Sequence, residues 1–421
     1  MIFAHGQLLP DSALPSLLDT LADETNATRA TASLSPETVI SALDALAGRL
    51  EAGEFDPLLR QYLPAGASLN DLLSLLRREA LESKLKTELG EAPFVPQSHG
   101  RTAARRLPLG TLLHVTAGNM PGLPVYSAVE GLLCGNVNLI KLPRGDKGLS
   151  LAALQLLADQ APELAPFLYA FTFSSSETGV LKRLCDLADG VVTWGGDGAI
   201  TALRALAPPG CKLIEWGHRL GFAYISGYEN EAEELSDLAR HIIATGQRLC
   251  SACQVIFLDT AEKAEGEAFC QNFLPHLERA AGALHKPPEL GAQASLSGHT
   301  ALLCRIVEGR AEGERLFPGK GCSIVFCPGD ELELSPMEGN VLVKLLPQER
   351  LLAALRRQKG RLQTAGLICS PEKREALTDL LLRSGVTRIT RAGSLSHSFP
   401  GEAHDGEYPL RRYTRIADVE K

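Results

Sequence analysis

From Leu107 onward the chain alternates between short runs rich in β-branched or aromatic residues and longer segments with helical spacing. This alternation restricts the fold more than any other feature, because it is typical of parallel strands joined by helices in an α/β sheet. A second alternating region follows Gly221 and extends to about Ala392, so we predict an α/β protein with two doubly wound sheets. We expect strands at residues 112–115, 137–140, 170–173, 191–194, 212–214 and 255–258, and helices at 149–157 and 178–187.

The length of the chain favours the same division. A chain of 421 residues exceeds what one hydrophobic core usually supports. The first part is rich in Leu and Ala with helical spacing, and residues 71–79 predict a long amphipathic helix that ends near Gly90. We therefore predict a helical N-terminal region over 1–95, an α/β domain over 96–220, a second α/β domain over 221–392, and a C-terminal segment over 393–421 that returns to the first domain or to an oligomer interface.

Charge and composition disfavour several classes of function. The formal net charge is -8 and the pI is near 5.8, so we expect no nucleic-acid partner, and any anionic ligand must meet a local basic site. No run approaches the ~20 apolar residues that a membrane-spanning helix needs, and the first residues lack the pattern of a secretory signal. We therefore expect a cytoplasmic protein. Ten cysteines are too few for a disulfide scaffold in a chain of this length and should be thiols.

Cys250 is the candidate nucleophile. It lies in a segment between a predicted helix and the strand at 255–258, where a substrate can reach it. A thiolate attacks thioesters well, because the enzyme-bound thioester has an energy similar to that of the bond broken. A buried structural thiol is nevertheless the commoner role of any single cysteine.

Cys250 and Cys253 also form a CxxC pair. No second CxxC or histidine pair stands at zinc-binding spacing, so we expect no metal site. A thioredoxin-like role is disfavoured, because that motif opens a helix near the N-terminus of its fold. A protective disulfide under oxidation is the alternative role of the pair.

Three polar residues follow the predicted strands at 112–115 and 137–140. Asn119 lies between glycines, where its amide can donate a hydrogen bond to a developing oxyanion, although a turn residue bonded to its own backbone has the same pattern. Lys141 and Arg144 are two cations at the carboxyl end of a parallel strand. They suit a nucleotide phosphate or ribose, although a solvated loop looks the same.

Two further strand ends carry candidate site residues. Thr193 ends a strand that leads through Gly195 and Gly196 into a helix, and such a turn can hold a pyrophosphate, although it is not a GxGxxG motif. Glu215 follows the next strand and is a candidate general base; the alternative is a salt-bridged or capping glutamate.

The order of these residues resembles that in aldehyde dehydrogenases. The oxyanion asparagine, ribose-binding lysine, pyrophosphate turn, glutamate base and nucleophilic cysteine of that superfamily match, in order, Asn119, Lys141, Gly195 with Gly196, Glu215 and Cys250. More specifically, residues 77–416 are similar to the LuxC-type long-chain acyl-CoA reductases. The segments that carry this similarity are 117–122, 136–141, 247–254, 385–389 and 404–410.

The resemblance implies an aldehyde dehydrogenase-like fold, in which 96–220 binds NAD(P), 221–392 carries the nucleophile and a cleft lies between them. It implies that Cys250 attacks an acyl-CoA or acyl-protein thioester, that the thiol leaves, and that hydride transfer from the nicotinamide gives an aldehyde. Asn119 and the Cys250 backbone amide would hold the oxyanion, and Glu215 would manage the proton. Relatives exchange acyl groups with a synthetase or transferase subunit, so such a partner and a homo-oligomer are also implied.

Two positions depart from the family pattern. Arg144 stands three residues after Lys141, where NAD-preferring aldehyde dehydrogenases commonly place a glutamate that binds ribose hydroxyls. An arginine there attracts a 2′-phosphate, so we predict NADPH, with NADH less favoured. Cys253 stands where the luminescence reductases carry a different residue. Glu338 is the candidate for the second glutamate of the family, which binds the nicotinamide ribose.

Two alternatives to the reductase hypothesis remain open at this point. One is NAD(P)-dependent oxidation of an aldehyde to an acid, for which Glu215 would activate the hydrolytic water. The other is a catalytically inactive scaffold or binding subunit of an acyl-transfer complex. The presence of Cys250, Asn119 and Lys141 argues against the inactive subunit.

Overall fold

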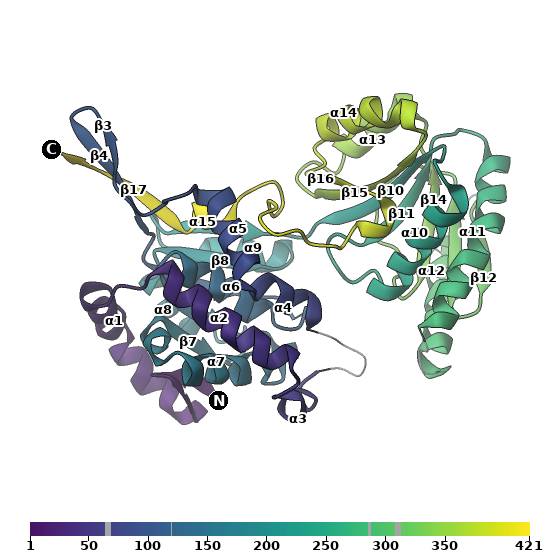
Figure 1. Ribbon diagram of the computed structural model, residues 1–421. Helices are drawn as coiled ribbons and strands as arrows, with labels where there is room; N and C mark the ends of the chain where they lie inside the picture. Colours follow the sequence, from purple (N-terminus) through teal and green to yellow (C-terminus); the bar gives the residue numbers. More distant parts are fainter. Residues whose placement is uncertain (64–68, 119, 285–287, 308–312) are drawn as a thin grey trace. The chain divides into compact units, whose positions relative to one another are not determined.

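A computed structural model describes residues 1–63, 69–118, 120–284, 288–307 and 313–421 (Figure 1). Contacts within the chain divide it into two compact units. The first unit combines Met1–Gly217 with Ser398–Lys421, and the second is His218–His397. Among the described residues, no helix combines the length and the apolarity that a bilayer crossing requires. The division of the chain into four parts at residues 95, 220 and 392 stays a prediction.

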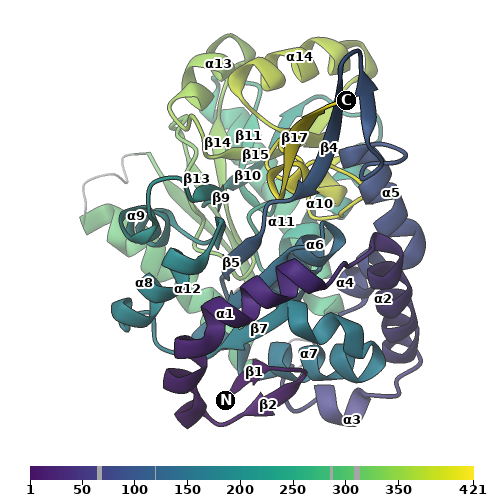
Figure 2. The ribbon, with the colours of Figure 1, turned by 90° about the vertical axis from the view of Figure 1, so that its left-hand side faces the viewer.

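The first unit is built on a seven-stranded sheet with the order β2-β1-β7-β6-β5-β8-β9. Strands β5 to β9 are parallel, and the order reverses beside β5, which is the topology of a doubly wound sheet. Right-handed crossovers place α6 and α7 on one face of such a sheet and α8 and α9 on the other (Figure 2). The elements of this unit are β1 (Ile2–Ala4), β2 (Gln7–Leu9), α1 (Leu14–Thr31), α2 (Pro36–Glu51), α3 (Asp56–Leu59), α4 (Asn70–Leu76), α5 (Arg78–Leu89), β3 (Gln97–His99), β4 (Thr102–Pro108), β5 (Thr111–Val115), α6 (Leu123–Leu133), β6 (Val137–Lys141), α7 (Leu149–Gln160), β7 (Leu168–Phe171), α8 (Thr178–Leu187), β8 (Gly190–Trp194), α9 (Asp197–Leu206), β9 (Lys212–Trp216), α15 (Pro409–Arg412) and β17 (Thr414–Glu420).

The second unit contains another seven-stranded sheet, with the order β12-β13-β14-β11-β10-β15-β16. All its strand pairs are parallel except β12 with β13. Separate apolar clusters cover its two faces, with α10 and α11 on one face and α13 and α14 on the other (Figure 1). The elements are β10 (Leu220–Ser226), α10 (Glu231–Thr245), β11 (Cys253–Leu258), α11 (Lys263–Ala283), α12 (Pro288–Val307), β12 (Arg315–Gly319), β13 (Cys322–Cys327), β14 (Asn340–Leu345), α13 (Gln348–Arg356), β15 (Leu362–Cys369), α14 (Arg374–Ser384) and β16 (Arg388–Thr390). The predicted α/β class with two doubly wound sheets is confirmed.

Two local expectations for the N-terminal part were wrong. Ile2–Ala4 and Gln7–Leu9 form a hairpin rather than a helix, with a two-residue loop of His5 and Gly6, both at positive φ. The single helix expected over 71–79 to Gly90 is two helices, α4 and α5. Arg77 between them is extended, because the Asp44 carboxylate of α2 accepts a hydrogen bond from the Arg78 backbone N–H and so caps α5.

The C-terminal strand β17 returns to the first unit. It pairs antiparallel with β4, which also pairs with β3, to give a separate three-stranded sheet. Figure 1 shows the yellow β17 alongside the blue β4. Ile416 and Val419 on β17 are exposed, and this leaves apolar side chains on the sheet surface.

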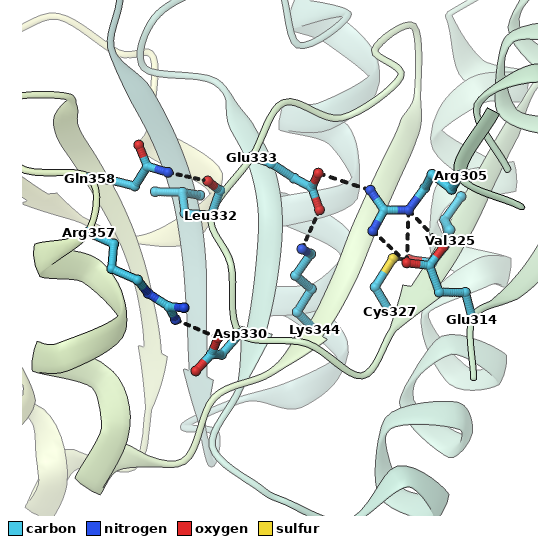
Figure 3. A network of polar contacts seen from close by, with 10 residues as sticks. All are labelled: Arg305, Glu314, Val325, Cys327, Asp330, Leu332, Glu333, Lys344, Arg357 and Gln358. Carbon is cyan, nitrogen blue, oxygen red and sulfur yellow. Dashed lines mark hydrogen bonds and ion pairs between the residues drawn. The ribbon is translucent and has the colours of Figure 1, made fainter. Parts of the chain in front are cut away.

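A buried charge cluster fixes the connection between β13 and β14 in the second unit (Figure 3). Glu333 in this connection accepts hydrogen bonds from Lys344 of β14 and from Arg305 of α12. Arg305 is also paired with Glu314. Burial opposes ionisation of Glu333, but the two cations outweigh this and lower its pKa, so Glu333 stays charged. Because the same connection leads on to Glu338, the cluster holds a segment of the candidate site.

We expect Glu333→Gln to destabilise the second unit by about 3 kcal/mol, because Lys344 would keep a buried charge without its carboxylate. The Lys344 side chain is only 2% exposed. Urea unfolding should show the change. The matched control is Arg357→Gln. Arg357 is half-exposed and pairs with Asp330, which also pairs with Arg350. This variant should lose less than about 1 kcal/mol of unfolding free energy. Equal losses in the two variants would contradict a structural role for the buried cluster.

Candidate active site

The first sheet brings three of the predicted site residues into one row. Lys141 pairs in register with Val115, Val115 with Thr193, and Thr193 with Glu215. The row lies at the carboxyl ends of parallel strands and crosses the point between β5 and β8 where the strand order reverses. Doubly wound sheets bind their ligands at this point.

A cavity of about 620 Å³ lies beyond the end of β6. Lys141, Arg144 and Lys147 supply its cations, and Ser174 and Ser175 supply hydroxyls. The Lys141 ammonium donates a hydrogen bond of 2.8 Å to Ser175, and burial lowers its pKa. Arg144 and Lys147 are exposed.

The carboxylate of Asp146, in the wall of this cavity, is bonded to the backbone. Asp146 accepts hydrogen bonds from the backbone N–H groups of Gly148 and Ser150 at 3.3 and 3.0 Å. Its carboxylate therefore caps the start of α7. The cavity as a whole suits an anionic ligand with hydroxyl groups.

Gly195 and Gly196 form the turn from β8 into α9, as the sequence predicts. The backbone N–H of Gly195 donates to the Trp216 carbonyl, and Gly196 is the N-cap residue of α9. A side chain at Gly196 would meet no heavy atom within 4 Å, so there is open space over the helix start. An anion can approach a helix N-terminus of this kind closely.

Glu215 is held by an arginine of the neighbouring helix. Both of its carboxylate oxygens accept hydrogen bonds of 2.6 Å from the Arg204 guanidinium. Each oxygen of Glu215 therefore uses one of its acceptor sites on Arg204. Asn119, the predicted oxyanion donor, lies outside the described residues.

Cys250 lies in the loop between α10 and β11, where the sequence places it. Its side chain is partly exposed, and its sulfur accepts a hydrogen bond of 3.4 Å from the Gln363 amide of β15. The loop passes very close to β10. A Cβ on Gly221 of β10 would lie only 2.4 Å from the Ser251 carbonyl oxygen of the loop. Only glycine fits at position 221.

Cys253, the other cysteine of the CxxC pair, has a different environment. It is fully buried in the apolar cluster beside α10, and burial raises the pKa of its thiol to about 12. Its backbone N–H donates to Nε2 of His241, and burial, with a smaller effect of His397, lowers the pKa of that histidine to about 4. Cys253 is therefore an inert thiol, which leaves Cys250 as the reactive one.

Two buried glutamines tie the Cys250 loop to the segment before β14. The Gln247 amide donates to the Cys253 carbonyl and to Ser335 Oγ, both at 2.9 Å, and accepts from the Gly339 backbone N–H. Gln254 donates to the Gln247 carbonyl, and its own oxygen accepts from both the backbone N–H and the hydroxyl of Ser335. This network holds Gln247 at φ 61°, an uncommon backbone conformation for a residue other than glycine.

We expect Gln247→Met to lower the free energy of unfolding by about 2–4 kcal/mol, because it removes three buried hydrogen bonds at nearly constant volume. The measurement is urea unfolding. Asn272→Leu is the matched control, because Asn272 is exposed on α11 and its amide donates to the Glu231 carboxylate. A change of under about 0.5 kcal/mol in both variants would show that the network is not needed for stability.

Glu338 lies next to the Cys250 loop. Its backbone N–H donates to the Gly246 carbonyl, and its carboxylate accepts a 2.6 Å hydrogen bond from Arg248. Met337 and Glu338 both have positive φ. The turn that presents this carboxylate therefore has a left-handed backbone, which is energetically unfavourable for residues other than glycine. The second unit thus brings the two predicted residues Cys250 and Glu338 onto adjacent segments.

Sequence reasoning missed several residues of this site. Gln363 and Ser335 lie far along the chain from Cys250 and belong to no motif, so no sequence signal marks them. Gln247 and Gln254 lie within segment 247–254, which the sequence singled out. Only their burial, which the sequence does not reveal, marks them as structural residues.

Comparison with known proteins gives the same family along most of the chain. The family model of acyl-CoA reductases (LuxC) matches residues 32–416. A long-chain acyl-protein thioester reductase of Vibrio harveyi is 25% identical over 358 residues, which cover 82% of this chain and 72% of the relative. The reductase of the same description from Aliivibrio fischeri is 24% identical over 360 residues, with the same coverage. The resemblance inferred from the sequence is confirmed.

Solved structures show the fold. Methylmalonate-semialdehyde dehydrogenase from Oceanimonas doudoroffii has a TM-score of 0.74 at 13% identity, covering all of this chain and 97% of that one. A protein of Sinorhizobium meliloti complexed with NAD has a TM-score of 0.70 at 14% identity, covering 99% and 91%. The predicted aldehyde dehydrogenase-like fold is confirmed.

Proposed function

Because the chain belongs to the acyl-CoA reductase (LuxC) family, we propose that it reduces a long-chain acyl thioester, carried by CoA or by a protein, to the aldehyde. The observation that carries this proposal is the contrast between the two cysteines of the Cys250 loop. Cys250 is reachable and accepts a hydrogen bond on sulfur, whereas Cys253 is buried with a raised thiol pKa. Relatives described as acyl-protein thioester reductases support the substrate class.

In the proposed reaction the Cys250 thiolate attacks the acyl carbonyl carbon. The bond from that carbon to the carrier sulfur breaks, the carrier leaves as a thiolate that takes up the proton lost by Cys250, and the acyl group stays on Cys250 as a thioester. Asn119 and the Cys250 backbone N–H are proposed to hold the oxyanion of each tetrahedral step. NADPH supplies, when bound, the hydride that reduces this thioester, after which the carbon–sulfur bond breaks and the aldehyde leaves.

The cofactor proposal rests on the residues of the first unit. We assign the 620 Å³ cavity beside Lys141 to the adenosine ribose and its 2′-phosphate, and the open start of α9 after Gly195 and Gly196, next to Thr193, to the pyrophosphate. Glu338 of the second unit is proposed to bind the nicotinamide ribose. The cations around the cavity favour NADPH over NADH.

A second cavity, of about 140 Å³, lies in the first unit. Its lining is largely apolar and includes Leu75, Met120, Leu123, Trp194 and Phe399. Met120 directly follows the proposed oxyanion donor, Asn119, in the chain. We therefore propose that this cavity takes the part of the acyl chain nearest the carbonyl.

Glu215 favours reduction over the oxidation of aldehydes to acids. Oxidation requires a base that activates water to hydrolyse the enzyme thioester, and both oxygens of Glu215 are bonded to Arg204. The test is a pair of steady-state assays, acyl-CoA with NADPH against aldehyde with NAD. Faster turnover of the thioester supports the reductase, and faster formation of the acid contradicts it.

We also propose that the protein assembles with copies of itself and receives acyl groups from a synthetase or transferase partner. The exposed Ile416 and Val419 on the small sheet β17-β4-β3 favour a protein contact there. The family's acyl-protein substrates favour the acyl-transferring partner.

A further inference from the structure

Gln363 is the residue whose side chain contacts the reactive sulfur, and nothing in the family pattern assigns it a role. It is the second residue of β15 and only 6% exposed. Its amide nitrogen donates a 3.4 Å hydrogen bond to Sγ of Cys250, which lies 113 positions away in the sequence. A buried amide aimed at a nucleophile can change the nucleophile's ionisation.

The sheet is irregular where Gln363 lies, and the irregularity aims its side chain. On β15, three residue steps from Leu362 to Ala365 match two steps on β10 from Leu220 to Phe222. The register with β11 shifts at the same place, next to Gly221. Such bulges redirect side chains and are frequent beside active sites.

The orientation of the amide is also set by its neighbours. The Thr364 hydroxyl donates to Gln363 Oε1, which leaves the amide nitrogen directed at the sulfur. The Gln363 carbonyl accepts from the backbone N–H and the hydroxyl of Thr387, so the strand is fastened at this residue independently of its side chain. A change of the side chain therefore leaves the backbone anchors in place.

We propose that Gln363 is a catalytic residue that stabilises the thiolate of Cys250 by hydrogen bonding. This inference rests on the proposed role of Cys250 as the nucleophile. A thiolate accepts a hydrogen bond more strongly than a thiol does, so an amide donor in a half-buried site favours ionisation and lowers the thiol pKa. The donor also keeps the sulfur in one position for attack.

Two of the titratable groups near the loop, Arg248 and His241, have other partners. Arg248, two residues before Cys250, is paired with Glu338 at 2.6 Å. His241 contacts the loop backbone and is neutral above pH 5, since its pKa is lowered to about 4 by burial and, less, by His397. The titratable and charged groups on the elements packed around the loop include Arg219, His241, Arg248, Glu338, Arg361, Arg388 and His397.

The test is the pH dependence of iodoacetamide alkylation at Cys250, followed by peptide mass spectrometry on the full chain without acyl substrate or cofactor. Site-specific detection is needed because Cys304 is also exposed. Gln363→Met should raise the alkylation midpoint by about one pH unit, since it removes one charge-assisted hydrogen bond. Gln363→Glu should raise it further, because a carboxylate repels the thiolate, and Gln363→Lys should lower it below that of the unaltered protein.

This charge order is the readout that a merely structural role would not produce. Gln358→Met is the matched control, because the Gln358 amide donates to the Leu332 carbonyl instead, and His397→Asn checks that the midpoint belongs to Cys250. Both should leave the midpoint unchanged. If Gln363→Lys does not fold, Gln363→Met and Gln363→Glu test the proposal by themselves. The proposal then requires that both raise the alkylation midpoint and that Gln363→Glu raises it more.

The proposal is overturned if the alkylation midpoints of the variants coincide, or if they do not rise in the order Lys, Gln, Met, Glu at position 363. Failure of this proposal can be distinguished from failure of the reductase hypothesis. Acylation of Cys250 with a flat series rejects the role of Gln363 alone, whereas the ordered series without any acylation rejects the reductase alone.

Discussion

Cys250→Ala will lower acyl-thioester reduction by at least about 10³-fold, because it removes the sulfur on which the enzyme-bound thioester forms. The variant should keep its fold, since Cys250 is partly exposed and lies in a loop outside the two apolar clusters of the second unit. The measurement is NADPH oxidation with an acyl-CoA, together with unfolding by urea. A loss of rate at unchanged stability separates a chemical role from a structural one.

Cys253→Ala is the control for this experiment. Cys253 is only three residues away but is buried, with a thiol pKa near 12. Its removal should cost about 1 kcal/mol of stability and leave the reduction rate within a few-fold. If instead Cys253→Ala abolished activity and Cys250→Ala did not, the nucleophile would be misassigned.

Arg144→Glu will reverse the preference between the two nicotinamide cofactors. The substitution removes a cation from the cavity beside Lys141 and places there a carboxylate, which repels a 2′-phosphate and can accept hydrogen bonds from ribose hydroxyls. We expect the ratio of kcat/KM for NADPH to that for NADH to fall by about 100-fold, the equivalent of about 2.7 kcal/mol.

The reversal needs a charge control, because any change of net charge affects the binding of anions. Lys182→Glu makes the same change of sign on α8, where Lys182 is half-exposed and pairs with Asp186. It should leave the cofactor ratio within about twofold, as expected for a surface ion pair. A ratio that Arg144→Glu does not alter would place the 2′-phosphate elsewhere.

The six strands expected from the sequence were predictable because each is a short, largely apolar run. The predicted strand 191–194 is β8 (Gly190–Trp194), and 255–258 lies within β11. Strand β7 lies two residues earlier than predicted, because the apolar run extends on both sides of it. The break between α4 and α5 was not predictable, since its cause is the carboxylate of Asp44 on another helix.

The candidate site likewise contains residues that could be predicted from the sequence and residues that could not. Lys141, Thr193 and Glu215 could be placed from the sequence because each ends a parallel strand, and parallel strands end at one edge. Gln363 could not, because its approach to Cys250 depends on the bulge in β15 and on the close passage of the Cys250 loop over Gly221. Contacts that depend on irregular register leave no periodic pattern in the sequence.

The buried glutamines show a related limit. Gln247 and Gln254 look like loop residues in the sequence, yet their hydrogen bonds join the Cys250 loop to Ser335. Burial of a polar side chain requires partners that only the fold supplies. The sequence therefore located the reactive cysteine but not the groups that hold its loop.

The most direct test of the proposed chemistry is to locate the acyl group on the protein. The chain is incubated with an acyl-CoA in the absence of cofactor, and peptides are mapped by mass spectrometry before and after NADPH is added. One residue, Cys250, should carry the acyl group, and its adduct should disappear with release of the aldehyde when NADPH is supplied. An acyl group on another residue, or an adduct on Cys250 that NADPH does not discharge, would contradict the proposed chemistry.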